Sequence, residues 1–392
     1  MSIRPSRSQR FRTRINRRLY GVLFRVYRAL FPTAQWAGCV PRSSLRRLLI
    51  VQHYGVGDMI LTTPLIGFLK EHVPDVEIDV LASPRNAAVV ADDDRVARVF
   101  VHDHTWRGWL TVLPKLRARR YDLILSGQAG RGLREGIIAS GISRRQTYKI
   151  SVWRPKRYHG LFTAVLRIPP RVTHTAGRLL YIGGGALGVP GAAASDAGTR
   201  YPLRMAADAK AEARAEAFVR ERGLAGGAFV VVNVSAHFAV RDWPPEHCAA
   251  SLSLILQRHP DLRAVLTPAP GKSGPAREVA ARCANPRVLV APELPLPDLA
   301  ALVRRALAVL SPNTAAVHLA AACGRPVVAL YAKEAPGWVA LWLPLGVPYR
   351  ALVAPDGAPV GEITPSHVAD AFDDLRRDMH ATSGATAVAA EQ

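Results

Sequence analysis

The sequence predicts an α/β protein whose two doubly wound, Rossmann-like domains face each other across a cleft. Three observations support this fold class: β-rich runs alternate with helical stretches, the alternation starts again midway along the chain, and 49% of the 392 residues are hydrophobic. Such alternation indicates parallel sheets covered on both faces, and the apolar content suffices for two cores. Ligands of such sheets bind outside the carboxyl ends of the strands, so we expect a site in the cleft.

The first series of elements defines an N-terminal domain at residues 48–185. Four β-rich runs are expected to be strands, and a helical stretch follows each of them. The expected strands are Leu48–Gln52, Val76–Ala82, Ala97–His102 and Tyr121–Ser126, and the expected helices are Met59–His72, Pro84–Ala91, Trp106–Arg119 and Gly130–Ser140.

A linker with a connecting helix, residues 186–225, leads to a second domain at 226–362. The linker region includes a Gly- and Ala-rich stretch around Gly183–Gly198 and a helix at Ala206–Arg222. A C-terminal helix is expected at 363–380 and a disordered tail at 381–392. The second-domain strands are Phe229–Val234, Arg263–Thr267, Val288–Ala291, Ala308–Leu310 and Val327–Tyr331, and its helices are Pro245–Arg258, Ala276–Ala284, Pro297–Ala306 and Ala315–Cys323.

The formal net charge of +22 is concentrated in a basic N-terminal arm at residues 1–47. Twelve arginines and no acidic residue precede Asp58, and apolar side chains recur at three- and four-residue steps from Phe11 to Leu30. On a helix this spacing gives an apolar stripe flanked by arginines, which favours an inner-membrane surface as partner. A solvated tail is the alternative. Nucleic acid is not expected, because the arm lacks zinc ligands and a recognition-helix pattern.

The remaining composition favours a cytoplasmic protein, peripheral on the inner face of the cytoplasmic membrane. The four cysteines lie far apart without a CxxC pair, which suits a reducing compartment and indicates neither a zinc site nor disulfides. No apolar run reaches the roughly 18 residues that a bilayer-spanning helix needs. Arg25 and Arg28 interrupt the apolar core that a secretory signal would need.

The first expected strand leads into Gly55-Val56-Gly57-Asp58 and then into a helix. The two glycines let the backbone turn sharply and approach a ligand, and they bring Asp58 to the mouth of the cleft. A carboxylate there can act as a general base. The alternative is that Asp58 only caps the helix.

Two segments of the second domain contain residue types that can hold a diphosphate. In the first, Ser235, Ala236 and then Arg241 follow a strand, so that small side chains and amides bind oxygens while the guanidinium neutralises charge. A surface loop with an exposed arginine is the alternative.

The second segment runs from Asn313 to His318. Asn313 or Thr314 would cap a helix whose free amides, including that of Ala315, face the cleft and favour phosphate. His318 lies one turn further on the same face as Thr314, although a buried core histidine is the alternative.

Basic residues also cluster in the first domain, beside the arm. They would suit an anionic acceptor, which would make the first domain the acceptor domain, unless the cluster is a solvated face. The candidate acceptor-binding residues are Arg131, Arg134, Arg154 and Lys156.

Together the segments resemble glycosyltransferase family 9, the ADP-heptose:lipopolysaccharide heptosyltransferases. Gly57-Asp58 and the following Thr62-Thr63-Pro64-Leu65 match the family's Gly-Asp loop and Thr-x-Pro helix. Arg241-Asp242-Trp243-Pro244 matches its Lys-x-Trp-Pro segment, and Asn313 to Ala320 matches its Asp-Thr-Gly-Pro-x-His-Leu-Ala segment. The resemblance runs from about Leu48 to Met379.

This resemblance implies a GT-B fold and an inverting, metal-independent sugar transfer without a cofactor. The implied donor is ADP-heptose, and the implied acceptor is an anionic lipid-linked glycan such as the lipopolysaccharide core. Asp58 would be the base. The donor diphosphate would be held by Ser235, Arg241, Thr314, the amides after it and His318.

The chain also departs from the family pattern. Arg241 replaces the lysine, Asn313 replaces the aspartate beside the donor sugar, and Ala315-Ala316 replaces Gly-Pro. The acidic residue that the family places after the third strand of this domain has no counterpart in 267–273. A donor sugar other than heptose therefore stays open, as do a nucleotide-sugar epimerase and a non-catalytic sugar-nucleotide or membrane adaptor. The intact Asp58 favours an enzyme.

Overall fold

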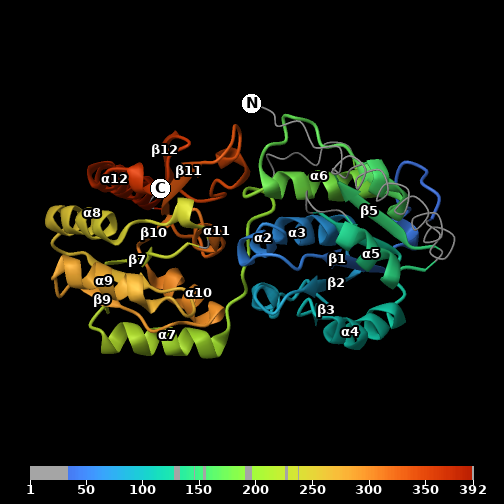
Figure 1. Cartoon of the computed structure of the whole chain (residues 1–392), viewed down its shortest axis with the longest axis horizontal. Helices are drawn as coiled ribbons and strands as arrows, with labels where there is room; N and C mark the ends of the chain where they lie inside the picture. Colours follow the sequence, from blue (N-terminus) through green and yellow to red (C-terminus); the bar gives the residue numbers. More distant parts are fainter. Residues whose placement is uncertain are drawn as a thin grey trace, which may run out of the picture.

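The computed structural model confirms two α/β domains, each with a parallel six-stranded sheet (Figure 1). It describes residues 34–127, 133–144, 146–152, 156–189, 197–225, 228–236 and 238–390, so most of the basic arm lies outside the described residues. The first sheet has the order β3-β2-β1-β4-β5-β6, and the second has β12-β11-β10-β7-β8-β9. In both sheets the strand order reverses beside the first strand of the domain, which is where doubly wound sheets bind ligands.

The first domain contains strands with buried, β-branched sequences and five described α-helices. The strands are β1 (Arg47–Val51), β2 (Glu77–Ala82), β3 (Arg98–Val101), β4 (Leu123–Ser126), β5 (Tyr148–Val152) and β6 (Ala164–Leu166). The helices are α2 (Val56–Ile60), α3 (Thr63–His72), α4 (Trp106–Ala118), α5 (Leu133–Ile142) and α6 (Thr175–Leu187).

The second domain repeats this arrangement. Its strands are β7 (Phe229–Asn233), β8 (Arg263–Thr267), β9 (Val288–Val290), β10 (Ala308–Pro312), β11 (Val327–Lys333) and β12 (Tyr349–Asp356). Its helices are α7 (Ala209–Glu221), α8 (Pro245–Arg258), α9 (Ser273–Cys283), α10 (Leu296–Arg305), α11 (Ala315–Ala322) and α12 (Pro365–Ala390).

Two expected helices of the first domain take a different form. The single helix expected at 59–72 is divided into α2 and α3, because Pro64 occupies the first turn of α3 and has no N–H to continue α2. The hydroxyl of Thr63 donates instead to the Ile60 carbonyl at 2.8 Å. The helix expected at 84–91 is only a 3₁₀ turn at Ala87–Val89, since the Asn86 side chain accepts the Ser83 N–H and forms a local turn.

The sequence did not indicate β5, β6, α6 or β12. The glycines at 183–185 were expected only as the start of a Gly- and Ala-rich stretch, whereas in the structure they belong to α6 and let this helix approach α3 closely. A Cβ built at Gly183 would lie only 2.6 Å from Leu65 Cδ1, so a larger residue does not fit. At the start of the domain, Val40 and Leu45 are buried in its core, although both belong to the 1–47 segment that we expected to be an arm.

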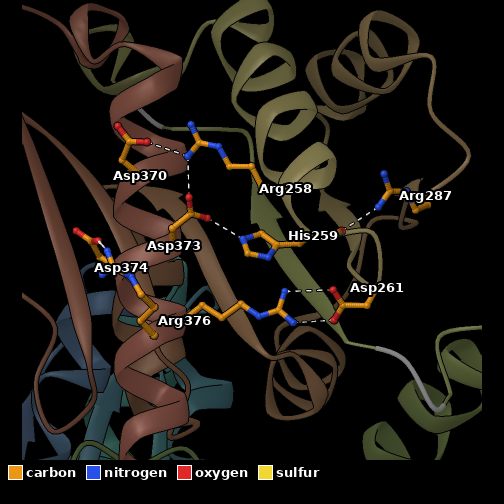
Figure 2. A network of polar contacts seen from close by, with 9 residues as sticks. Arg258, His259, Asp261, Arg287, Asp370, Asp373, Asp374 and Arg376 are labelled. Carbon is orange, nitrogen blue, oxygen red and sulfur yellow. Dashed lines mark hydrogen bonds and ion pairs between the residues drawn. The ribbon is translucent and has the colours of Figure 1, made fainter.

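The last helix is attached to α8 by a network of ion pairs (Figure 2). Arg258 at the end of α8 donates to Asp370 and Asp373 of α12 at 2.8 and 2.7 Å, and Arg376 pairs with Asp261 at 2.7 Å. Helix α12 continues through 381–390, where we expected a disordered tail. Five of these ten residues are alanines, which favour a helix, and the stretch contains no proline.

The two domains meet through α2 and α11, and one cluster of buried apolar side chains extends across both of them. Among the described residues, none of the helices is both long enough and apolar enough to cross a bilayer.

Candidate active site

The loop that carries Asp58 and the start of α11 lie against each other at the junction of the domains. A Cβ built at Gly57 would lie 3.0 Å from His318 Cδ2 and 3.5 Å from Ala315 Cα, so glycine permits this close approach. The structure therefore brings together Gly57 and two of the residues expected to bind the donor, although they are far apart in the sequence.

Asp58 is half-exposed in the first turn of α2, and its carboxylate Oδ2 accepts the Gly55 N–H at 3.1 Å. A Cβ at Gly55 would come within 2.8 Å of the same oxygen, so Gly55 provides the space for this bond. Asp58 thus caps its own helix, which is the role that the sequence left open as the alternative to a general base. The capping bond also fixes the direction of the carboxylate, which is compatible with a role as base.

Buried polar side chains that the sequence reasoning missed hold this loop in place. Gln52 donates to the Thr62 hydroxyl at 3.0 Å, and that hydroxyl donates to the Asp58 carbonyl at 2.8 Å. From the next strand connection, Asn86 donates to the Gln52 carbonyl at 3.0 Å. A sequence signal for this role existed: the amide side chain of Gln52 comes directly after a buried apolar strand, where a polar group needs a hydrogen-bond partner.

In the second domain, Asn233 links the Ser235 loop to the start of α11. Its Nδ2 donates to the Thr314 hydroxyl at 2.9 Å, to the Ser311 hydroxyl at 3.0 Å and to the Ser235 carbonyl at 3.1 Å. Thr314 Oγ1 accepts the Ala316 N–H at 3.2 Å, so Thr314 is the N-cap. Asn313 is buried, and its N–H donates to the Leu330 carbonyl at 2.8 Å. Sequence reasoning identified the cap but missed Asn233.

Ser235 and Ala236 are both buried at the end of β7. The Ser235 hydroxyl has no hydrogen-bond partner among the residues that the structure describes, and a buried unpaired hydroxyl is unfavourable. The Ala236 carbonyl accepts from Lys272 Nζ at 3.0 Å, which places a second cation near this loop.

Arg241 forms an ion pair rather than projecting freely into solvent. Its Nε donates to Glu334 Oε1 at 2.5 Å, and its guanidinium lies 4.9 Å from the ring centre of Phe238 and 5.7 Å from that of Trp338. The side chain is 17% exposed, so Arg241 lies partly covered by these neighbours. A bound diphosphate would have to share this cation with Glu334.

His318 is 2% exposed and faces Gly57. Burial, followed by the charge of His174, lowers the pKa of His318 to about 3, so the imidazole is neutral at physiological pH. His318 can therefore provide a hydrogen bond to a ligand but not a positive charge.

The expected acceptor cations are not placed by the structure. Arg131 and Arg154 lie outside the described residues. Arg134 belongs to α5 and Lys156 to a 3₁₀ helix at Lys156–Leu161, but their side chains are outside the described part.

Solved structures of similar proteins identify the fold. A family 9 glycosyltransferase from Veillonella parvula superimposes with a TM-score of 0.73 at 18% identity, covering 84% of this chain and 97% of that one. The Escherichia coli heptosyltransferase WaaC with ADP gives 0.62 at 20% identity, covering 84% and 98%. The fold is thus the two-domain GT-B fold.

Sequence comparison then gives the family. The model of glycosyltransferase family 9 (heptosyltransferase) matches residues 109–355, and the chain belongs to this family. Lipopolysaccharide heptosyltransferase 3 of Escherichia coli K12 is 25% identical over 291 residues, which are 70% of this chain and 79% of that protein.

Proposed function

We propose that this glycosyltransferase moves heptose from ADP-heptose to the lipopolysaccharide core or a related anionic lipid-linked glycan, with inversion and without a metal. The names of the relatives support donor and acceptor: one is a lipopolysaccharide heptosyltransferase, and another was solved with ADP. The observation that carries the proposal is the contact between the Asp58 loop and the start of α11, because it joins a base to a phosphate-binding helix end.

In the proposed reaction Asp58 takes the proton of an acceptor hydroxyl. The hydroxyl oxygen forms a bond to the anomeric carbon while the bond from that carbon to the diphosphate oxygen breaks, and ADP leaves with the electron pair. Attack from the face opposite the leaving group inverts the configuration. The bond from Gly55 would aim the carboxylate at the hydroxyl.

The second domain would stabilise the negative charge that grows on the leaving diphosphate. The amide of Ala315 at the start of α11 and the guanidinium of Arg241 are the groups suited to this, and the Ser235 hydroxyl offers a further donor. Since His318 is neutral, its contribution would be a hydrogen bond.

The variant Asp58→Asn tests the base. Asparagine retains an oxygen that can accept the Gly55 N–H but cannot take a proton, so we expect transfer to fall by about 10²-fold or more. The rise in melting temperature on adding ADP should stay as in the wild type, because donor binding lies on the other domain. Transfer at the wild-type rate would refute the assignment of Asp58.

A panel of nucleotide sugars tests the donor. Selective stabilisation by ADP and ADP-heptose supports heptose transfer. Asn313 and Ala315-Ala316, which replace the family's usual residues, favour a second candidate, a family member that uses a non-heptose donor for another surface glycan. Preference for a UDP- or GDP-sugar would select that candidate, and donor binding without turnover on added lipid acceptor would select the adaptor. For location, we propose the cytoplasm, at the inner surface of the membrane.

A further inference from the structure

Helix α4 lies on the outside of the first domain (Figure 1), and two of its large apolar side chains are exposed. Trp106 is 69% exposed, Leu110 one turn later is 62% exposed, and Ile137 of the neighbouring α5 is 43% exposed. Arg117 of α4 donates to the Gly141 carbonyl at 2.7 Å, which holds the two helices together at this surface. Exposed tryptophan and leucine one helical turn apart are typical of an interaction surface.

Packing within the domain does not account for these side chains. The opposite face of α4, with Val112 and Leu116, already packs on β1 and β2 in a separate buried cluster. Trp106 and Leu110 are therefore additional apolar surface, whose exposure to water is unfavourable unless a partner covers it.

The charge of the same surface indicates what the partner is. No acidic residue occurs between His104 and Arg120, whereas five basic residues do: Arg107, Lys115, Arg117, Arg119 and Arg120. One carboxylate, that of Asp103, lies at the start of α4, where it accepts the Thr105 N–H. Cations outnumber it along the helix, and an apolar stripe with such an excess of positive charge complements an anionic bilayer.

A hollow of about 450 Å³ at the C-terminal half of α4 strengthens this argument. Arg47, Arg98, Phe100, Lys115, Ala118 and Arg119 line it. The nearby carboxylates are already used, because Glu77 pairs with Arg47 and Arg119 while Asp79 pairs with Arg119. Within the described part of the chain, Arg98 and Lys115 form no ion pair, so the hollow has an excess of positive charge that can hold phosphate groups.

We propose that this α4 surface docks the protein on an anionic membrane. Trp106 and Leu110 enter the interface between headgroups and acyl chains, and Arg98 and Lys115 contact lipid phosphates. Trp106 lies just after the carboxyl end of β3, whereas the hollow lies at the amino ends of β1 and β3, so this contact extends along the whole length of α4. The proposal goes beyond sugar transfer and does not depend on the donor or on the N-terminal arm.

Vesicle binding by the full-length protein tests the proposal. Phosphatidylcholine vesicles with and without phosphatidylglycerol are sedimented, and the bound fraction is measured. The double variant Trp106→Ser, Leu110→Ser should bind about tenfold more weakly, because two apolar side chains no longer leave water. Arg98→Gln with Lys115→Gln should lower binding by about tenfold only when phosphatidylglycerol is present. Lys210→Gln, at an exposed site on α7, is the matched control and should bind as the wild type does.

Quenching by brominated lipid separates this surface from the arm when it is measured in a Trp36→Phe background, because Trp36 is the one tryptophan among residues 1–47. We expect quenching in this background and in its Trp109→Phe variant, and its loss in its Trp106→Phe variant. Quenching that persists in Trp106→Phe, or unchanged binding of the serine variant, would overturn the proposal. So would a vesicle-independent dimer that the serine variant abolishes, because a second copy would then cover the surface. A rise in melting temperature on adding ADP that equals that of the wild type shows that a variant is folded. Loss of vesicle binding in such a variant then argues about docking alone and not about the proposed transfer reaction.

Discussion

Replacing Gly57 with alanine tests whether the contact between α2 and α11 sets the geometry of the active site. The new Cβ would lie 3.0 Å from His318 Cδ2 and 3.5 Å from Ala315 Cα, whereas carbon atoms prefer a separation of about 3.5–4.0 Å. His318 is buried, so the helices must separate by roughly half an ångström to relieve the clash. Overpacking of this kind costs about 1–3 kcal/mol, and a 1 Å misplacement can cost about 10²-fold in rate.

A shift of half an ångström corresponds to about half of this loss on a logarithmic scale. We therefore expect Gly57→Ala to lower kcat by about tenfold and to lower Tm by a few degrees. Release of ADP at saturating acceptor measures the rate, and scanning calorimetry measures Tm. Gly274→Ala on α9, where nothing lies within 4 Å of the new Cβ, is the matched control and should keep the wild-type rate. A wild-type rate and Tm in Gly57→Ala would refute the reasoning.

Two further predictions concern buried polar groups. Asn233→Ala removes the hydrogen bonds to Ser311, Thr314 and the Ser235 carbonyl. We expect the free energy of unfolding in urea to fall by about 2 kcal/mol and the ADP-induced rise in Tm to become smaller. A rise in Tm as large as that of the wild type would contradict a role at the donor site. Burial lowers the pKa of Lys149 from its ordinary 10.5 to about 8. Because the unfolded chain then binds more protons between these values, the free energy of unfolding should rise from pH 8 to pH 10.5 relative to that of Lys149→Met, and parallel pH curves for the two proteins would contradict this.

The sequence predicted the elements whose local pattern is strong and missed those whose pattern depends on tertiary contacts. Apolar, β-branched runs such as 229–233 are strands in the structure as expected. Strand β5 was missed because Lys149, fully buried and donating to the Ser140 hydroxyl at 3.0 Å, gives it the pattern of an exposed segment. The glycine run of α6 does not predict a helix by itself. Its reason lies in tertiary packing, because a Cβ at Gly183 would clash with Leu65 and Phe68.

The candidate active site shows the same difference between residues recognisable from local sequence and residues that depend on tertiary contacts. Thr314 and Asp58 were identifiable because capping depends on residues next to each other in the sequence. Asn233 contacts Thr314 across 81 positions, and Arg241 contacts Glu334 across 93 positions, so no local pattern indicates either pair. The pairing of Arg241 matters most, since it changes an assumed free cation into one that a ligand must share.

The apolar cluster that extends across both domains has a consequence for recombination between relatives. The two sheets have the same strand order, and in the proposed reaction each domain contributes one part of the chemistry, which suggests exchanging either domain on its own. The seam between α2 and α11, however, admits no side chain at Gly57 and requires a matching apolar surface on the other half. A hybrid protein that takes its first and second domains from different relatives will therefore fold and work only when the α2 surface of one matches the α11 surface of the other.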